Sequence, residues 1–350
     1  MILFIGGGSV AGIVRTQLYV DEFVKAGKKV CVISYFPKEH HNCISLKYRE
    51  TPTPESIVRQ LPKRILNKLK FVTTVFDVYI DVVGALNSYL KLPGVSSKNA
   101  EILKSKTRSI TSLCEDVPED FELLPFYTEN VPKDLPVILK PESGTGAIRF
   151  NELCYKTVVN PELKQEGAST FGDLVAQKKW QGDQTIYGLN YYHDGFKLHR
   201  LFASNIVKDE TYQLVSLKKI EGECPQLDSW RIIQDKPFGL FFNIQCFFNI
   251  QTGKFLPFDI NSRFSAVTHE CIKLIDPSFM ESVIYGIKKK KEIPNELKVP
   301  WFCIEQTSDS LPPEFIPITN KIPPKEDPTY RPPISCYVGE NYDKTPISSK

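Results

Sequence analysis

The sequence has almost no net charge, and this absence limits what the protein can bind. Lysine and arginine together number 44 against 41 aspartate and glutamate residues, which leaves a formal net charge of +3. Proteins that bind DNA or RNA neutralise many phosphates with a clustered excess of cations. No such excess is present here, so polymeric nucleic acid is not an expected partner.

The nine cysteines lack the spacing of a metal site or of a disulfide framework. No CxxC or CxxH pattern occurs, and most cysteines stand in apolar, strand-like surroundings such as Val30-Cys31-Val32. Scattered thiols of this kind fit a reducing compartment. The sequence therefore predicts free thiols in a cytoplasmic protein.

Long apolar runs are also missing. No window of about 18 uninterrupted apolar residues occurs, so no membrane-spanning helix is expected. The apolar N-terminus, Met1–Ile5, is interrupted by Gly6-Gly7-Gly8 and lacks the basic start and cleavage site of a signal peptide. We interpret it as a buried strand.

The chain divides into three stretches of different texture, and its 350 residues with 41% apolar composition suffice for two or three small domains. Residues 1–94 predict a small α/β domain, and residues 95–290 a domain rich in antiparallel sheet. Residues 291–350 are rich in proline and predict an extended segment or a partly disordered tail.

Hydrophobic periodicity and turn residues predict the elements within these stretches. In the first stretch they are a strand, a glycine-rich turn, a helix and two strands: Ile2–Ile5, Gly6–Gly12, Gln17–Ala26, Lys29–Ser34 and Phe71–Asp77. One helix is expected over Lys98–Leu113, with Lys106 in its middle. Strands are expected at Val137–Lys140, Leu174–Gln177, Thr185–Tyr192, Lys197–Ser204, Phe241–Phe248 and Phe255–Ile260.

The most specific motif lies on the predicted hairpin 241–264, which turns at Thr252-Gly253. With a side-chain period of two, Gln245 faces the same side as Asp259 and Asn261 on the partner strand. Oxygen ligands suit Mg²⁺, which keeps several waters and bridges protein carboxylates to nucleotide phosphates. The pattern predicts a magnesium site with Arg263 beside it; the alternative is the polar face of an ordinary hairpin.

This segment resembles the metal-binding hairpin of ATP-grasp enzymes, and its Asn-Ile-Gln form is similar to that of carbamoyl phosphate synthetase. The resemblance implies an α+β ATP-grasp fold of two lobes clamping ATP, preceded by a small α/β preATP-grasp domain. It assigns Mg²⁺ to Gln245, Asp259 and Asn261, and stabilisation of an acyl phosphate to Arg263. Asp259 stands where the family usually has glutamate and Ser262 where it has proline, which leaves open whether one or two ions bind.

A second motif is the apolar strand 137–140 followed by small residues. It is not a Walker motif, because its lysine precedes the glycines. It resembles the ATP-grasp phosphate loop, in a subdomain of about 107–176. The resemblance places Lys140 on the α-phosphate, where it is also a catalytic residue, and the small residues Ser143, Gly144, Thr145 and Gly146 over the β- and γ-phosphates.

A third segment, 174–184, resembles the ATP-grasp hinge. The resemblance implies that Gln177 takes the exocyclic amine of adenine, that the backbone at Lys178 and Trp180 pairs with the adenine edge, and that Gln184 holds the ribose. Lys106 stands where the family has its first phosphate lysine. The order of these positions is similar to the family order: Pro93-Gly94, Lys106, Lys140, Gln177, Gln184, Gln245, Asp259, Asn261 and Arg263.

The glycine-rich turn Gly6–Gly12 also raises the alternative of dinucleotide binding. Its spacing is not Gly-x-Gly-x-x-Gly, and the strand ending at Ser34 carries no acid for a ribose. In the ATP-grasp interpretation this turn helps to hold the acceptor substrate.

The resemblance implies a ligase that uses Mg-ATP to turn a small-molecule carboxylate into an acyl phosphate for capture by an amine. Two alternatives remain: phosphorylation of bicarbonate or carbamate, and a nucleotide-binding pseudo-ligase that serves as a scaffold. The identity of the carboxylate and of the nucleophile stays open. So does the oligomeric state, with a homodimer among the alternatives.

Overall fold

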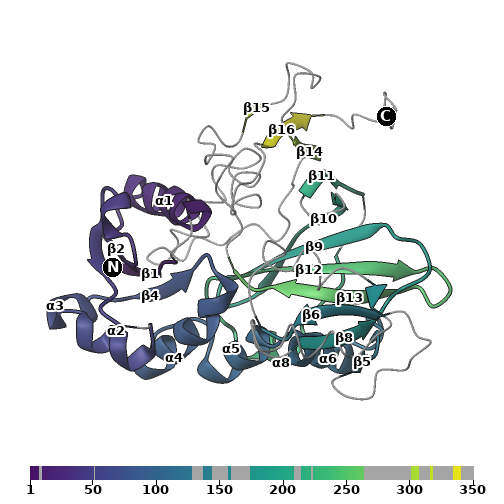
Figure 1. Cartoon of the computed structure of the whole chain (residues 1–350), viewed down its shortest axis with the longest axis horizontal. Helices are drawn as coiled ribbons and strands as arrows, with labels where there is room; N and C mark the ends of the chain where they lie inside the picture. The colour runs from purple at the N-terminus through teal and green to yellow at the C-terminus, as the bar shows by residue number, and fades with distance from the viewer. Residues whose placement is uncertain are drawn as a thin grey trace.

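The computed structural model describes residues 1–7, 10–50, 52–127, 137–143, 157–158, 174–208, 214–221, 224–263, 301–306, 316–317 and 334–339. These parts of the chain form three sheets and the helices that cover them (Figure 1). Among the described residues no helix is long and apolar enough to cross a membrane.

The N-terminal sheet is parallel, with the strand order β3-β2-β1-β4. Its strands are β1 (Ile2–Ile5), β2 (Val30–Ser34), β3 (Ile44–Lys47) and β4 (Phe71–Thr74). Every residue of β1, β2 and β4 is buried, as expected for parallel strands covered on both faces. The predicted strand Phe71–Asp77 is shorter in the structure, because Asp77 begins the 3₁₀ helix η2 (Asp77–Tyr79).

Helices cover the two faces of this sheet (Figure 1). Phe4 packs with Tyr19 and Phe23 of α1 (Val10–Lys25), which begins earlier than the predicted helix. On the opposite face, Leu3 packs with residues of α2 (Pro54–Gln60) and α4 (Ile80–Leu90). Further short helices are η1 (Pro37–Glu39), α3 (Lys63–Leu66) and α8 (Arg231–Gln234). The side chains of β1 therefore enter two hydrophobic cores in turn, because successive side chains of a strand point to opposite faces of the sheet.

A large antiparallel sheet follows, with the order β13-β12-β9-β10-β11-β14-β16-β15. Its strands are β9 (Ile186–His193), β10 (Leu198–Lys208), β11 (Leu214–Lys219), β12 (Leu240–Asn249), β13 (Lys254–Asn261), β14 (Trp301–Gln306), β15 (Ile316–Pro317) and β16 (Ile334–Gly339). The antiparallel strands expected between 185 and 260 are confirmed. Gly253 turns the β12–β13 hairpin with a positive φ of 70°, which glycine adopts readily.

The proline-rich stretch after residue 291 corrects one expectation. It contributes β14, β15 and β16 to the large sheet, where the sequence predicted only an extended or disordered segment. β14 precedes Pro312-Pro313, β15 lies between that pair and Pro323-Pro324, and β16 follows Pro332-Pro333; Pro317 lies on β15 at the edge of the sheet, where proline is tolerated. Prolines therefore separate strands here without preventing them.

The third sheet has the order β5-β8-β6-β7 and lies close to the β12–β13 hairpin (Figure 1). It consists of β5 (Phe126–Tyr127), β6 (Val137–Pro141), β7 (Thr157–Val158) and β8 (Leu174–Lys178). The strands predicted at 137–140 and 174–177 are confirmed. Lys140 pairs with Val175, which brings β6 and β8 together beneath the hairpin.

The single helix expected over Lys98–Leu113 is two helices, α5 (Ser97–Lys104) and α6 (Lys106–Asp116). Ser105 has extended backbone angles, and its side chain accepts a hydrogen bond from the Arg108 N–H, as an N-cap does. The prediction of Lys106 in mid-helix was wrong: it is the first residue of α6. Because of this break, the Lys106 side chain extends from the N-terminal end of α6 and not from the middle of a longer helix.

Candidate functional site

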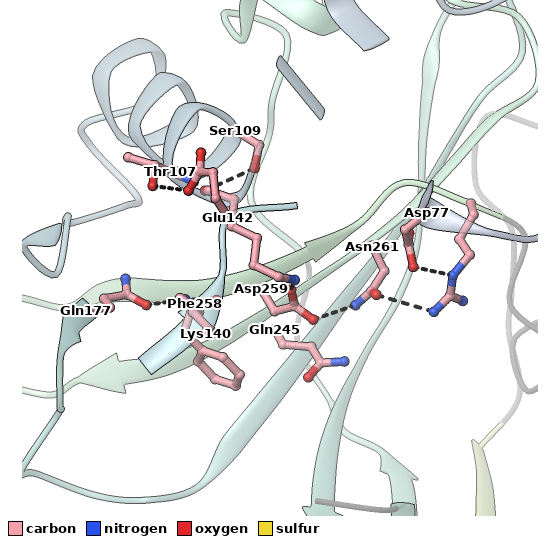
Figure 2. Close-up of polar contacts among 12 residues, drawn as sticks. Asp77, Thr107, Ser109, Lys140, Glu142, Gln177, Gln245, Phe258, Asp259 and Asn261 are labelled. Carbon is pink, nitrogen blue, oxygen red and sulfur yellow. Dashed lines mark hydrogen bonds and ion pairs between the residues drawn. The ribbon is translucent and has the colours of Figure 1, made fainter. Parts of the chain in front are cut away.

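Asp259 on β13 lies at the centre of the site, as Figure 2 shows. It pairs in register with Gln245 of β12, so the predicted juxtaposition of these residues is present. Its Oδ1 accepts from Lys106 Nζ at 2.5 Å and its Oδ2 from Asn261 Nδ2 at 3.0 Å. The cations Lys106, Lys208 and Lys140 outweigh the effect of burial and hold the pKa of Asp259 well below its usual range. The carboxylate is therefore ionised at neutral pH.

Lys106 reaches Asp259 from the N-terminus of α6, which Glu142 anchors. The Lys106 N–H donates to the Glu142 carbonyl at 2.8 Å. The Glu142 carboxylate accepts from the hydroxyls of Ser105 and Thr107. An acid at a helix N-terminus also interacts favourably with the helix dipole. Burial lowers the pKa of Lys106, but the Asp259 carboxylate outweighs this effect and the net pKa is raised.

Lys140 of β6 is buried, and its ammonium group donates to Gln177 Oε1 and to the Phe258 carbonyl. It also lies 5.2 Å from the centre of the Phe126 ring. Burial, followed by repulsion from Lys106, lowers the pKa of Lys140 to about 7. Both of its hydrogen-bond acceptors are neutral, and the carboxylates of Asp259 and Glu142 oppose the shift without cancelling it, so a further anion would favour its charged form.

Lys208, at the end of β10, is a member of the site that sequence reasoning missed. Its Nζ donates to Gln245 Oε1 at 2.6 Å and lies 5.9 Å from the centre of the Phe258 ring. Burial lowers its pKa, with Asp259 acting in the opposite direction. No local signal marks Lys208, because a lysine at a strand end usually reaches solvent. Only the sheet order, which places β9 between β10 and β12, brings it to Gln245.

Arg263, just after β13, connects the site to the N-terminal sheet. Its Nε donates to Asp77 Oδ2 at 2.6 Å, and its Nη2 donates to Asn261 Oδ1 at 3.4 Å. The Asp77 carboxylate outweighs the effect of burial and raises the pKa of Arg263. Sequence reasoning also missed Asp77 as a site residue, although an acid just beyond a parallel strand was the available signal.

Figure 2 shows Gln177, Lys140, Asp259, Asn261 and Asp77 following one another across the site. Among the described residues, four basic side chains and three carboxylates gather here: Lys106, Lys140, Lys208, Arg263, Asp77, Glu142 and Asp259. The positive excess suits a bound polyanion such as a nucleotide polyphosphate.

Comparisons with known proteins rest on structure, since no protein-family model and no curated protein matches the sequence. An L-amino acid ligase from Bacillus licheniformis has a TM-score of 0.66 and 12% identity, over 97% of this chain and 93% of its own. An N5-carboxyaminoimidazole synthetase from Staphylococcus aureus complexed with ADP has a TM-score of 0.68 and 15% identity over the same shares. The chain has the ATP-grasp fold.

A biotin carboxylase from Campylobacter jejuni shares the ATP-grasp fold too, with a TM-score of 0.65 and 10% identity over 97% of this chain and 87% of its own. The predicted fold class, α+β with an ATP-grasp architecture, is thereby confirmed. Identities this low establish the fold alone. The chemistry of this chain has to be argued from its own residues.

The side chains and backbone of the segment predicted to be the hinge already form hydrogen bonds within the protein. Gln184 Nε2 donates to the carbonyls of Trp180 and Gly182, at 3.2 and 2.7 Å, and the Lys178 N–H donates to the Pro125 carbonyl. Gln177 is buried; besides accepting from Lys140, its amide donates to the Leu124 and Pro257 carbonyls. Binding of adenine by Gln177 and of ribose by Gln184 would therefore require both amides to exchange partners.

The segment predicted to be the phosphate loop is described only at its start. Ser143 is exposed and follows Glu142, which anchors α6. The predicted phosphate-binding residues Gly144, Thr145 and Gly146 lie outside the described residues.

The predicted metal ligands fit magnesium better than a metal held by protein alone. The described residues contain no group of three or more His, Cys, Asp or Glu side chains suited to a metal. They do bring one ionised carboxylate, Asp259, together with the amides of Gln245 and Asn261. Mg²⁺ commonly takes one or two protein carboxylates and completes its shell with waters and phosphate oxygens. This donor set is compatible with Mg²⁺ bound together with a nucleotide.

Proposed function

We propose that the chain is an ATP-dependent ligase that activates a small-molecule carboxylate as an acyl phosphate, releasing ADP, for capture by an amine. The observation that carries this proposal is the surrounding of Asp259 by cations from three separate elements: Lys106 from α6, Lys140 from β6 and Lys208 from β10. Such a ring around an ionised carboxylate is expected where a metal–polyphosphate complex binds.

Each predicted site residue has a role in this proposal. Lys106 and Lys140 bind phosphates, together with the loop Ser143–Gly146. Lys140, with its pKa of about 7, gains a full charge when phosphates approach, because anions favour its protonated form. Gln177, Lys178, Trp180 and Gln184 hold the nucleoside. We add Lys208 to the phosphate-binding set, since it shares Gln245 and Asp259 with the metal position.

Mg²⁺ would be held by Asp259, Asn261 and Gln245, where it neutralises phosphate charge and orients the transferring group. Arg263 lies beside Asn261, fixed by Asp77, and so presents its guanidinium next to that position. A preoriented cation of this kind stabilises charge that develops on the acyl phosphate and on the transferring phosphoryl group. No side chain has to act as a nucleophile.

A non-catalytic nucleotide-binding scaffold is the second candidate, and one observation favours it. Asp259 is the only carboxylate among the proposed metal ligands, and both its oxygens already accept hydrogen bonds, from Lys106 and Asn261. A chain that retained nucleotide binding but had lost metal-dependent turnover could show this arrangement. Phosphorylation of bicarbonate or carbamate is a variant of the ligase proposal and uses the same residues.

We also propose the division into a preATP-grasp domain, 1–94, and an ATP-grasp domain beginning at 95. All four strands of the parallel sheet lie within the first range. Strands β14 and β16 pair with the large sheet, so we assign them to the same structural unit as 95–290. A cytoplasmic location and a homodimer remain part of the proposal.

An ADP-release screen tests the function. The full chain is incubated with Mg-ATP, hydroxylamine and pools of amino acids, sugar acids and dicarboxylates, with bicarbonate as a separate arm. A ligase gives carboxylate-dependent ADP together with hydroxamate, because hydroxylamine traps acyl phosphates without needing an acceptor site. Asp259→Asn should abolish both signals, whereas Asp116→Asn, which removes a carboxylate paired with Arg231 outside the site, should keep them. ATP binding with no carboxylate-dependent ADP in any pool would favour the scaffold.

A further inference from the structure

One carboxylate oxygen of Asp77 makes no hydrogen bond within the part of the chain that the structure describes. Oδ2 accepts from Arg263 Nε, but Oδ1 is buried and makes no hydrogen bond among the described residues. A buried, unpaired carboxylate oxygen destabilises a fold, because it has lost water and gained no donor. A small cavity beside Arg263 is lined by Thr74, Asn87 and Ser262 but not by Asp77, so a water there would not supply the donor. A ligand that donates a hydrogen bond would satisfy this atom.

The position of Asp77 in the fold points the same way. The strand order β3-β2-β1-β4 reverses between β1 and β4, and Asp77 follows the carboxyl end of β4. In open parallel sheets, ligands bind outside the carboxyl ends of the strands at such a reversal. Gly6 and Gly7, which follow β1, form the other side of this point. A Cβ on Gly7 would come within 2.5 Å of the Phe76 ring, so the backbone lies directly against that ring.

Aromatic side chains line the same edge of the sheet. The Phe76 and Tyr79 rings are 5.9 Å apart, and the Tyr35 and Tyr48 rings 4.9 Å apart. Burial, and then Tyr35, raise the pKa of Tyr79 to about 12, so the two pairs form one cluster. Tyr35 is 39% exposed, whereas Tyr48 is buried and donates to the Gly6 carbonyl at 3.0 Å. These rings follow the carboxyl ends of β2, β3 and β4, the same edge of the sheet as Asp77, and the cluster is partly open to solvent at Tyr35.

We propose that this edge is the acceptor subsite and that it selects a primary amine with an aromatic or apolar body. The ammonium form donates to Asp77 Oδ1, and the rings of Phe76, Tyr79 and Tyr35 contact the body and the cation. This inference rests on the proposed function, since it names the acceptor of that reaction. Asp77 then has two roles, because its other oxygen orients Arg263 beside the predicted acyl phosphate.

Charge complementarity favours an amine over a phosphorylated acceptor. A phosphate placed at Asp77 Oδ1 would meet a second anion, whereas an ammonium group supplies the missing donor and neutralises the charge. In this structure Asp77 Oδ1 is buried, so an amine can reach it only after a side chain at this edge has moved. Tyr35, the most exposed ring of the cluster, is the residue best able to move.

Calorimetric titration of the full chain tests the subsite with two probes of one shape. Tyramine carries a ring and a protonated amine, and 4-ethylphenol carries the ring alone. The parent chain should bind tyramine at least about tenfold more tightly than 4-ethylphenol. Asp77→Asn should remove that difference, since its amide keeps an oxygen for Arg263 but loses the anionic oxygen. Asp81→Asn is the matched control, because Asp81 is close to Asp77 in sequence but pairs with Lys104. This variant should keep the difference in affinity between the two probes.

Tyr35→Ala should weaken both probes and serves as a second variant that does not touch the Arg263 contact. Absence of saturable tyramine binding to the parent chain, or equal tyramine affinity in Asp77→Asn, would overturn the subsite. Saturable binding of ribose 5-phosphate in its place would overturn the amine class. The ligase itself fails separately: tyramine bound through Asp77 with no hydroxamate from any carboxylate contradicts the proposed function and leaves the subsite standing.

Discussion

Lys106 and Asp259 are 153 residues apart in sequence and form an ion pair of 2.5 Å between Nζ and Oδ1. Their side chains keep 19% and 24% of their surface exposed, so solutes can approach the pair. In this structure Lys106 neutralises the charge of Asp259, the proposed metal ligand. When Mg-ATP binds, Lys106 would have to turn toward the phosphates. The site is therefore arranged so that internal ion pairs are exchanged for contacts with the ligand.

Replacing Lys140 should stop turnover and leave the fold in place. Lys140→Met keeps the length of the buried side chain but removes the charge that we assign to phosphate binding. We expect carboxylate-dependent ADP release to fall by about 100-fold or more. Lys29→Met, an exposed lysine of the N-terminal domain, is the control and should keep full activity. Circular dichroism melting verifies folding. Near-parental ADP release from Lys140→Met would show that the phosphate site lies elsewhere.

Nucleotide binding should take up a proton above neutral pH. Lys140 has a pKa of about 7 against 10.5 for a free lysine, and bound phosphates favour the charged form. At about pH 8 the free chain is largely neutral at Lys140, so Mg-ATP binding should recruit a proton. Calorimetry in two buffers of different ionisation enthalpy measures this uptake. Lys140→Met should lose it, whereas Lys29→Met, the exposed control outside the site, should retain it.

The same shift has a consequence for stability. Between about pH 7 and 10.5, the unfolded chain carries a proton on Lys140 that the folded chain lacks. The contribution of Lys140 to the free energy of unfolding therefore increases with pH across this window. Urea denaturation of the parent and of Lys140→Met at several pH values measures the contribution as a difference. A parallel pH dependence of the two chains would contradict the assigned pKa.

Gln245→Glu should strengthen magnesium binding. It adds a second carboxylate in register with Asp259, and the affinity of such sites rises with ligand charge. We expect the Mg²⁺ concentration that half-saturates nucleotide binding to fall by about tenfold, partly opposed by a new ion pair with Lys208. Titration of Mg²⁺ at fixed ATP gives the value. An unchanged Mg²⁺ requirement would place the metal away from Gln245.

Local sequence pattern predicted the parts of the site that share one hairpin. Side chains alternate along paired strands, so the positions of Gln245 and Asp259 follow from the turn at Gly253, even with a bulge after Gln245. The strands around Lys140 and Gln177 were predictable for the same reason. Local pattern failed at Ser105, where an N-cap hydrogen bond and the contact with Glu142 end one helix and begin another.

Two residues that enter the site through contacts distant in sequence were missed. Lys208 belongs to a strand that β9 separates from β12, and its burial depends on the order of the sheet. Asp77 reaches Arg263 across 186 residues of sequence. The sequence predicts that a polar residue at the end of a strand is exposed, and only contacts with elements distant in sequence change that.

The transfer of ¹⁸O from substrate to phosphate tests the central claim most directly. With a carboxylate labelled in both oxygens, found by the ADP-release screen, an acyl phosphate intermediate must pass one labelled oxygen to inorganic phosphate when the amine displaces it. Phosphorus NMR resolves labelled from unlabelled phosphate. We predict one ¹⁸O in each phosphate released in the presence of the amine, and no phosphate release from Asp259→Asn. Unlabelled phosphate at full turnover would show that water attacks ATP and that the chain is not a ligase of this kind.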